Sequence, residues 1–294
     1  MSTMRGNRSR VAGRGRVGRL FRAAVVVVAG LVSGFALYVL LVGLGVLPKF
    51  YPSASGDLAL ARSDRVGLRV LFVGNSITYT NDMPALVHQL AAADPGARPI
   101  FAVKYTAGGW RLKFASEDDG LAALLKEVPW DVVVLQEHSR VASLPEDERR
   151  REMDPFVRAL HAKIERAGAR TFLFLPYGGR GVDGDSYEAA QSRLWYGYSD
   201  LALQLPATVV PVGLAWGEAL GRQPGLDLLG WSGHPNQLGS YLMACVFYAV
   251  LSHRDPTWSR FTAGIEPAEA QYLQYNAANV VARNLAMDFG TSGP

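Results

Sequence analysis

The fold follows from one continuous stretch, which runs from Leu68 to Pro84 and reads LRVLFVGNSITYTNDMP. It begins with an apolar run, Leu68 to Val73, whose branched and aromatic side chains are typical of a strand covered on both faces. A glycine, an asparagine and Ser76 follow directly, and a helical pattern opens at Asp82. Ser76 is therefore expected in the turn between the carboxyl end of a strand and the next helix.

Four later stretches repeat this apolar composition, and helical patterns separate them. Strands are expected at Pro99 to Tyr105, Asp131 to Gln136, Thr171 to Leu175 and Thr208 to Val212. Helices are expected at Met83 to Ala93, Leu121 to Glu127, Asp147 to Ala167, Ser186 to Gln204, Gln237 to Leu251 and, packed on the outside, Pro267 to Met287. Such alternation is typical of βαβ units. The sequence therefore predicts an α/β fold, a three-layer α/β/α sandwich with a parallel sheet of roughly five strands.

The N-terminal part of the chain differs in composition from the rest. Ala23 to Leu47 contain no charged residue, and as a helix these 25 residues would span roughly 37 Å, enough to cross a bilayer core of about 30 Å. The alternative is a cleaved signal peptide, whose apolar region is about 7–15 residues long and ends in small residues. Because this run is longer and is followed by Pro48 and Lys49, we expect an uncleaved transmembrane signal anchor.

A basic tail precedes this apolar segment. All seven of its charged residues are arginines, and the positive-inside rule places such a tail in the cytoplasm. We therefore expect a single-pass protein of the cell membrane. Its parts would be a cytoplasmic tail (1–22), a transmembrane helix (23–47), a linker (48–65) and an extracytoplasmic domain (66–294).

The charge balance excludes a nucleic-acid partner for the domain. Seven of the 30 Lys and Arg lie in the tail, which leaves 23 basic residues against 26 acidic ones and no basic footprint. Cys245 is the only cysteine and lies in an apolar run, so we expect a buried, inert thiol and no disulfide or cysteine metal cluster. The sequence predicts neither a metal site nor a cofactor.

Ser76 is a candidate nucleophile because of its expected position. In open parallel sheets, functional sites form at the carboxyl ends of the strands. A serine there can present its hydroxyl to a pocket while its backbone N–H points at a developing oxyanion. Local pattern alone favours an ordinary turn serine, so the assignment depends on a histidine that can act as its base.

Five histidines are available for that role. His88, His161 and His253 fall in or just after helical patterns and are expected to be packing or surface residues. His138 follows the third strand and could reach the site. His234 lies in a loop immediately before a helix, which makes it the natural base.

From about Leu68 to Leu251 the chain resembles the GDSL-type or SGNH hydrolases. The Gly-Asn-Ser sequence that ends at Ser76 resembles the family block that carries the nucleophile and one oxyanion donor. His234, followed by Pro235, resembles the last block, whose histidine is the base. The resemblance implies a flavodoxin-like SGNH fold and a serine esterase activity.

Two further blocks of the family supply oxyanion donors, and here the agreement is partial. Ala107 to Trp110 resembles the glycine block, which implies that Gly109 donates beside Ser76. Where the family carries an asparagine, this chain has Gln136, whose amide can also donate.

The acid that orients the histidine in the family stands three residues before it, and this position is Trp231. Asp227 could fold back to hold the imidazole, or a backbone carbonyl could hold the ring in a Ser–His dyad. Asn81 and Tyr177 are placed to line the pocket as substrate-binding residues, with loop packing as the alternative.

Together these features predict a membrane-anchored serine hydrolase that cleaves a carboxylic ester on a small molecule, a lipid or an envelope glycan. Two alternatives stay open. One is acyl transfer to or from an envelope glycan. The other, motivated by the missing acid at position 231, is a non-catalytic domain that binds glycan or protein.

Overall fold

The structure is a computed structural model, which describes residues 52–178, 186–231 and 233–286. The expected tail and membrane segment, residues 1–47, lie outside the described residues. Within the described part of the chain, no helix is long and apolar enough to span a bilayer. All described residues belong to one compact unit that begins at Pro52.

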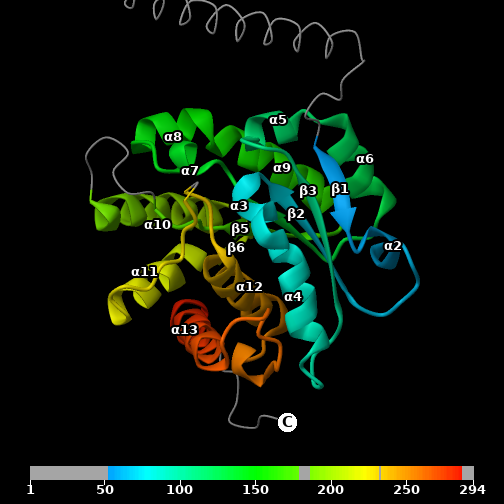
Figure 1. Cartoon of the computed structure of the whole chain (residues 1–294). Coiled ribbons are helices and arrows are strands. Elements are labelled where there is room, and N and C mark those ends of the chain that lie inside the picture. The colour runs from blue at the N-terminus through cyan, green and yellow to red at the C-terminus, as the bar shows by residue number, and fades with distance from the viewer. Residues whose placement is uncertain (1–51, 179–185, 232, 287–294) are drawn as a thin grey trace, which may run out of the picture. The chain divides into compact units, whose positions relative to one another are not determined.

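The described residues form one six-stranded sheet in the order β1-β3-β2-β4-β5-β6 (Figure 1). Its strands are β1 (Ser53–Gly56), β2 (Leu68–Gly74), β3 (Ile100–Thr106), β4 (Val132–Leu135), β5 (Arg170–Phe174) and β6 (Thr208–Val210). Neighbouring strands from β3 to β6 are parallel, whereas β1 runs antiparallel to β3 at the edge. This arrangement confirms the predicted α/β fold with a mostly parallel sheet.

The sheet has one strand more than the roughly five that the sequence predicts. β1 and the short helix α2 (Leu58–Ala61) lie within residues 48–65, which were expected to be a linker. Ser53 pairs with Thr106, and Asp57 accepts a hydrogen bond from the Ala102 N–H at 3.1 Å. β1 is small and largely exposed, so no apolar run marks it. Pairing with the free edge of β3 makes this segment a strand.

Helices cover both faces of the sheet (Figure 1). One face packs against α4 (Met83–Ala92), α11 (Val212–Arg222), α12 (Gln237–Ser252) and α13 (Pro267–Leu285). The other packs against α5 (Leu112–Ser116), α6 (Asp119–Glu127), α9 (Asp154–Arg166) and α10 (Tyr187–Gln204). Short connecting helices are α3 (Ser76–Tyr79), η1 (Thr80–Asp82), α7 (Ser139–Ala142), α8 (Glu146–Glu152) and η3 (Pro256–Trp258).

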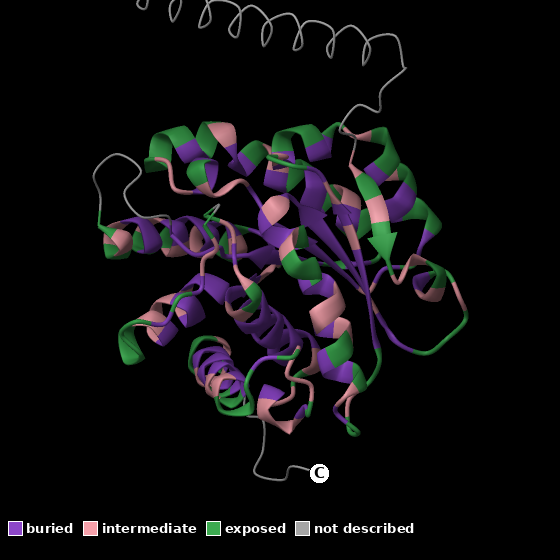
Figure 2. Cartoon of the chain, in the orientation of Figure 1, coloured by how far each residue is buried: buried purple, intermediate pink, exposed green. Residues whose placement is uncertain are grey.

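Each face of the sheet has its own hydrophobic core, because successive residues of a strand point to opposite faces. In β2, Val70 and Phe72 join the cluster of α4 and α12, whereas Leu71 and Val73 join the cluster of α9 and α10. Figure 2 shows strands β2 to β6 and the inner helix faces as mostly buried. Cys245 lies in the buried helix α12, and burial raises the pKa of its thiol. The thiol is buried, as the sequence predicted.

One predicted helix is two helices in the structure. The segment Asp147 to Ala167 was expected to be continuous, but it breaks at Met153 between α8 and α9. Pro155 lies in the first turn of α9. A proline has no N–H to continue a helix and collides with the preceding turn, so it is tolerated only at a helix start.

The strand order creates a topological switch point at the carboxyl end of β2, because the next strand in sequence, β3, lies on one side of β2 and β4 lies on the other. Ligands of open α/β sheets bind at such points. Ser76 lies two residues after the end of β2, and Gln136 directly follows β4. The fold therefore brings the loops after these strands to the same edge.

Candidate active site

Ser76 and His234 meet at this carboxyl edge. Oγ of Ser76 lies 2.8 Å from Nε2 of His234, although 158 residues separate them in the sequence. Both residues are partly buried. A general base must lie within about 2.6–3.2 Å of the proton donor that it serves. The distance between these two atoms meets that requirement.

The turn before Ser76 is held by the side chain of Asn75. Its Oδ1 caps α3 by accepting a hydrogen bond from the Ile77 N–H at 3.2 Å. Its Nδ2 donates to the Trp110 carbonyl at 2.9 Å, which ties this turn to the loop after β3. Ser76 is the first residue of α3, so its own N–H has no partner within the helix. That N–H can face an oxyanion.

Gln136 supports the nucleophile turn from behind. Its Oε1 accepts hydrogen bonds from the Asn75 N–H at 2.9 Å and the Thr78 hydroxyl at 3.0 Å, and its Nε2 donates to the Glu137 carbonyl at 2.6 Å. The side chain is completely buried. Gln136 was expected to donate to the oxyanion. Instead, its amide oxygen and its amide nitrogen both form hydrogen bonds within the protein. A Cβ on Gly74 would lie 2.6 Å from this Oε1, so the close approach requires glycine.

His234 lies in the loop between α11 and α12. The Gly230 N–H donates to the His234 carbonyl at 2.7 Å, and Leu229 and Pro235 form an isolated antiparallel bridge. Asn236 then caps α12, because its Oδ1 accepts a hydrogen bond from the first turn at 3.0 Å. The imidazole is thus carried on a bridged loop that is joined to the start of α12.

Asp227 has hydrogen-bond partners in the loop between α11 and α12. Its Oδ1 accepts a hydrogen bond from the Leu229 N–H at 3.1 Å, and its carbonyl accepts one from Asn236 Nδ2 at 2.7 Å. Trp231, at the position where the family carries its acid, has a fully exposed side chain. The carboxylate of Asp227 therefore stabilises its own loop.

Gly109 lies in the turn that follows β3. The turn is closed by a hydrogen bond from the Trp110 N–H to the Ala107 carbonyl at 3.3 Å, and the Ala107 N–H donates to the Gly74 carbonyl at 3.4 Å. Gly109 has φ of +62°, a conformation that favours glycine, and is exposed. The turn therefore lies beside the end of β2, and its backbone is exposed at Gly109.

The two residues expected to bind substrate have other contacts. Tyr177 is 6% exposed and stacks on Trp216, with ring centroids 4.0 Å apart, so its ring belongs to the core beneath the edge. Asn81 donates from Nδ2 to the Pro235 carbonyl at 3.0 Å and to Ser240 Oγ at 2.9 Å. Its amide thus bridges two parts of the protein.

Three of the remaining histidines of the domain have other partners. Nδ1 of His88 lies 3.0 Å from a carboxylate oxygen of Asp57, whose hydrogen bond raises the pKa of the imidazole. Nδ1 of His161 lies 2.8 Å from the Thr171 hydroxyl. His138 caps α7, and burial lowers the pKa of its ring. The described histidine that contacts Ser76 is His234.

Glu137 is a residue of the site that the sequence did not single out. Its side chain is completely buried. One carboxylate oxygen accepts a hydrogen bond from the His138 N–H at 2.5 Å and the other from the Leu112 N–H at 3.2 Å. Burial raises the pKa of this carboxyl from 4.5 to about 7. The one sequence signal is a carboxylate two residues after a wholly apolar strand.

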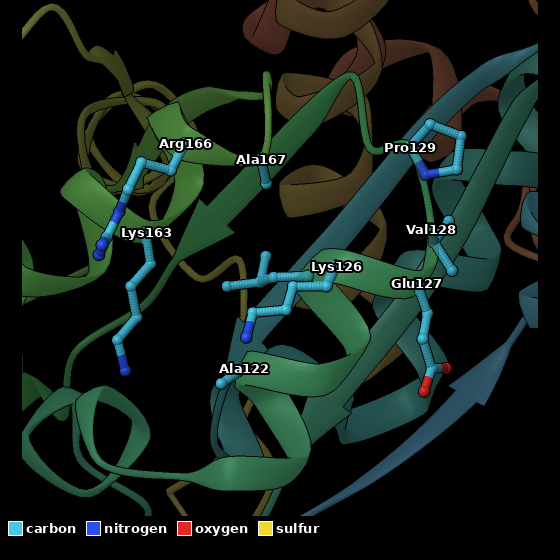
Figure 3. A pocket seen from close by; sticks show the side chains of 9 residues that line it. Ala122, Lys126, Glu127, Val128, Pro129, Lys163, Arg166 and Ala167 are labelled. Carbon is cyan, nitrogen blue, oxygen red and sulfur yellow. The ribbon is translucent and has the colours of Figure 1, made fainter.

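The hollow in Figure 3 lies at the amino ends of the parallel strands, opposite the carboxyl ends beside which Ser76 and His234 meet. It has a volume of about 650 Å³, and its lining comes from the last turns of α6 and α9 and from the segments that lead into β4 and β5. Its cations are Lys126, Lys163 and Arg166. Cations at helix C-termini interact favourably with the helix dipole, which accounts for their positions. Across the described residues, no group of three or more His, Cys, Asp or Glu could hold a metal ion.

By sequence, no protein-family model and no curated protein matches the chain. By structure, several solved proteins are similar. A DUF4886 family protein from Bacteroides uniformis has a TM-score of 0.62 and 16% identity, covering 77% of this chain and 98% of its own. A protein of Slackia heliotrinireducens assigned to the SGNH hydrolases has a TM-score of 0.51 and 23% identity, covering 62% and 97%. The fold of the chain is therefore SGNH-like.

An acetylxylan esterase from Geobacillus stearothermophilus is also similar in structure, with a TM-score of 0.50 and 18% identity over 66% of this chain and 97% of its own. The resemblance expected from the Ser76 and His234 blocks is thereby confirmed at the level of the fold. At these identities the comparisons establish the arrangement of sheet and helices.

Proposed function

We propose that this domain is an SGNH-type serine ester hydrolase, with Ser76 as nucleophile and His234 as base. The observation that carries the proposal is the 2.8 Å distance between Ser76 Oγ and His234 Nε2 at the carboxyl edge of the sheet. A domain that only binds glycan or protein would not need a serine hydroxyl within hydrogen-bond distance of an imidazole. This distance favours the enzyme over the binding domain.

In the proposed reaction, Nε2 of His234 accepts the hydroxyl proton of Ser76 as Oγ bonds to the ester carbonyl carbon. The carbonyl oxygen becomes an oxyanion, to which the N–H groups of Ser76 and Gly109 donate. The bond to the alcohol then breaks, and the leaving oxygen takes the proton from His234. Water, deprotonated by His234, attacks the carbonyl carbon of the acyl-enzyme. The bond from that carbon to Ser76 Oγ then breaks, and Oγ takes the proton from His234, which releases the acid and restores the hydroxyl.

This proposal assigns no catalytic role to the Asp227 carboxylate. That carboxylate is bonded to the Leu229 N–H within its own loop. The expected alternative, a Ser–His dyad whose ring is held by the loop backbone, fits the bridge between Leu229 and Pro235 on either side of His234. The imidazole orientation is therefore proposed to come from the fold of the loop.

The proposed substrate is an O-acyl ester of a carbohydrate or another alcohol. One similar structure is named an acetylxylan esterase, which motivates an acetylated glycan as the first substrate to test. Lipid esters with long acyl chains are the second class of substrate to test. Faster release of acetate from the glycan than of long-chain acid from the lipid would favour the carbohydrate ester.

The test of the function uses the purified full chain. We expect a fluorophosphonate probe to label Ser76 and the protein to hydrolyse p-nitrophenyl acetate. Ser76→Ala should abolish both, whereas Ser252→Ala, a serine at the end of α12 that donates to the Tyr248 carbonyl, should keep both. A parent without labelling and turnover, or turnover that survives Ser76→Ala, would contradict the proposal.

Transfer and hydrolysis are separated by their products. With an acetylated donor and an unacetylated glycan acceptor, a hydrolase releases free acetate and leaves the acceptor unchanged. Acetate bound to the acceptor would identify acyl transfer from the same acyl-enzyme on Ser76. We propose hydrolysis, because water can reach a site formed on exposed loops such as that of Gly109.

We also propose that residues 23–47 anchor the protein in the cell membrane, with residues 1–22 in the cytoplasm and the domain outside. The support is the uncharged apolar run and the all-arginine tail before it. The full-length protein should resist alkaline extraction from membranes, and added protease should digest the domain in intact cells. A shortened, freely soluble chain would identify a cleaved signal peptide instead.

A further inference from the structure

The side-chain amide of Asn81 joins the nucleophile segment to the loop of the histidine. Its Nδ2 donates to the carbonyl of Pro235, the residue after His234, at 3.0 Å. The same nitrogen donates to Oγ of Ser240, in the first turn of α12, at 2.9 Å. Asn81 therefore contacts both the end of the histidine loop and the helix that follows it.

A second set of hydrogen bonds leads from α12 back to Ser76. Oγ of Ser240, which is completely buried, lies 3.4 Å from the Thr80 carbonyl. The Thr80 hydroxyl in turn donates to the Ser76 carbonyl at 2.6 Å. The short segment from Ser76 to Asn81 is thus bonded at Ser76, Thr80 and Asn81 to the elements that carry His234.

The backbone around Asn81 turns its amide toward α12. Asn81 and Asp82 have φ of +52° and +51°, which ends the helical turn after Ser76 before α4 begins. Asparagine and aspartate adopt this left-handed conformation more readily than other side chains with a Cβ. Asp82 points elsewhere, because its carboxylate pairs with Lys104 at 2.5 Å. These adjacent residues therefore have the same backbone conformation and different partners.

We propose that Asn81 is a positioning residue for the Ser76 and His234 pair, an inference that rests on the proposed function. By holding the Pro235 carbonyl, the amide fixes the loop at the residue next to His234. The imidazole nitrogen then stays within hydrogen-bond distance of Ser76 Oγ. A displacement of about 1 Å of a catalytic group can lower a rate about 100-fold.

The decisive variant is Asn81→Asp, which has nearly the same shape and tolerates the same backbone. It replaces the N–H donors with an oxygen that faces the Pro235 carbonyl. We expect kcat for p-nitrophenyl acetate to fall about 10- to 100-fold, with KM within about threefold of the parent. Fluorophosphonate labelling of Ser76 should slow by a similar factor. A substrate-binding residue would instead raise KM and leave kcat unchanged.

Two further variants separate this effect from a general disturbance of the turn. Asp82→Asn keeps a side chain that tolerates the backbone but loses the charge that pairs with Lys104, and we expect its kcat within about twofold of the parent. Asn81→Gly keeps the backbone conformation and removes the amide, so kcat should fall as in Asn81→Asp. If Asn81→Asp does not fold, Asn81→Gly decides the question.

The outcomes distinguish this inference from the function on which it rests. An active parent whose folded Asn81 variants keep their kcat, or change only KM, would overturn the positioning role and leave the esterase proposal intact. A loss of kcat in Asp82→Asn equal to that in Asn81→Asp would also overturn it. A parent without labelling or turnover would overturn the proposed function, and the inference with it.

Discussion

Glu137 accepts a hydrogen bond from the Leu112 N–H at 3.2 Å, which joins the loop after β4 to the start of α5. The acceptor is a completely buried carboxyl. Burial raises its pKa from 4.5 to about 7. The link between two loops of the candidate site is therefore made by a group that titrates near neutral pH.

The stability of the domain should depend on pH through Glu137. Between pH 4.5 and about 7 the folded chain holds a proton that the unfolded chain has released. The unfolding free energy should therefore fall as pH rises through this window, by an amount on the order of 3 kcal/mol from this group. Urea unfolding at about pH 5 and about pH 8 would measure the change, and Glu137→Gln should remove that component. An equal pH dependence in parent and variant would exclude Glu137 as its source.

Gly74→Ala should damage the nucleophile turn. The added Cβ would lie 2.6 Å from both Gln136 Oε1 and Thr78 Oγ1, and such overpacking costs about 1–3 kcal/mol of stability. Turnover should fall as well, because the turn carries Ser76. The matched control is Gly221→Ala in α11, where a Cβ meets nothing within 4 Å. Thermal unfolding and esterase rates should be measured for both variants. Equal stability and equal rates in Gly74→Ala and Gly221→Ala would contradict the prediction.

Asp227→Asn should change kcat less than about threefold, because Oδ1 of asparagine can still accept the Leu229 hydrogen bond. Where an aspartate orients a catalytic histidine, its replacement by asparagine typically lowers kcat about 10⁴-fold. His234→Ala provides the reference and should lose at least about a thousandfold. A loss in Asp227→Asn that approaches this reference would place the carboxylate on the imidazole.

Gln136→Ala should lower stability by about 1–3 kcal/mol, because it leaves the buried Asn75 N–H without its acceptor. Thr78→Val removes one hydrogen bond to Oε1 of Gln136 and should lower stability less than Gln136→Ala does. Denaturant unfolding combined with esterase kinetics measures both. If Gln136 acted as the oxyanion donor, its loss would instead lower kcat by about 10²- to 10³-fold with stability unchanged.

Much of the fold can be predicted from the sequence because its strands are short apolar runs and its helices have regular spacing. The run that ends at Val73 predicted both the strand and the turn that carries Ser76. β1 was missed for the same reason, since it is exposed and has no apolar run. Pairing with β3 is a long-range effect that leaves no local pattern.

The candidate site could be predicted only in part. Ser76 and His234 were singled out by their positions beside a strand and a helix, and the structure brings them together. Gln136 and Tyr177 were expected to face the pocket, yet both are buried. Residue type and position in the chain do not determine which way a side chain points at a loop, because the neighbouring loops decide that direction.

The sequence by itself determined the alternation of strands and helices, the turn at Ser76 and the loop of His234, since each depends on residues that are neighbours in the chain. The tertiary structure decided which side chains meet across distant segments. It placed Asn81 against Pro235, Gln136 against Asn75 and Asp227 within its own loop. Packing of the sheet and α12 sets these distances, and no local pattern of residues encodes them.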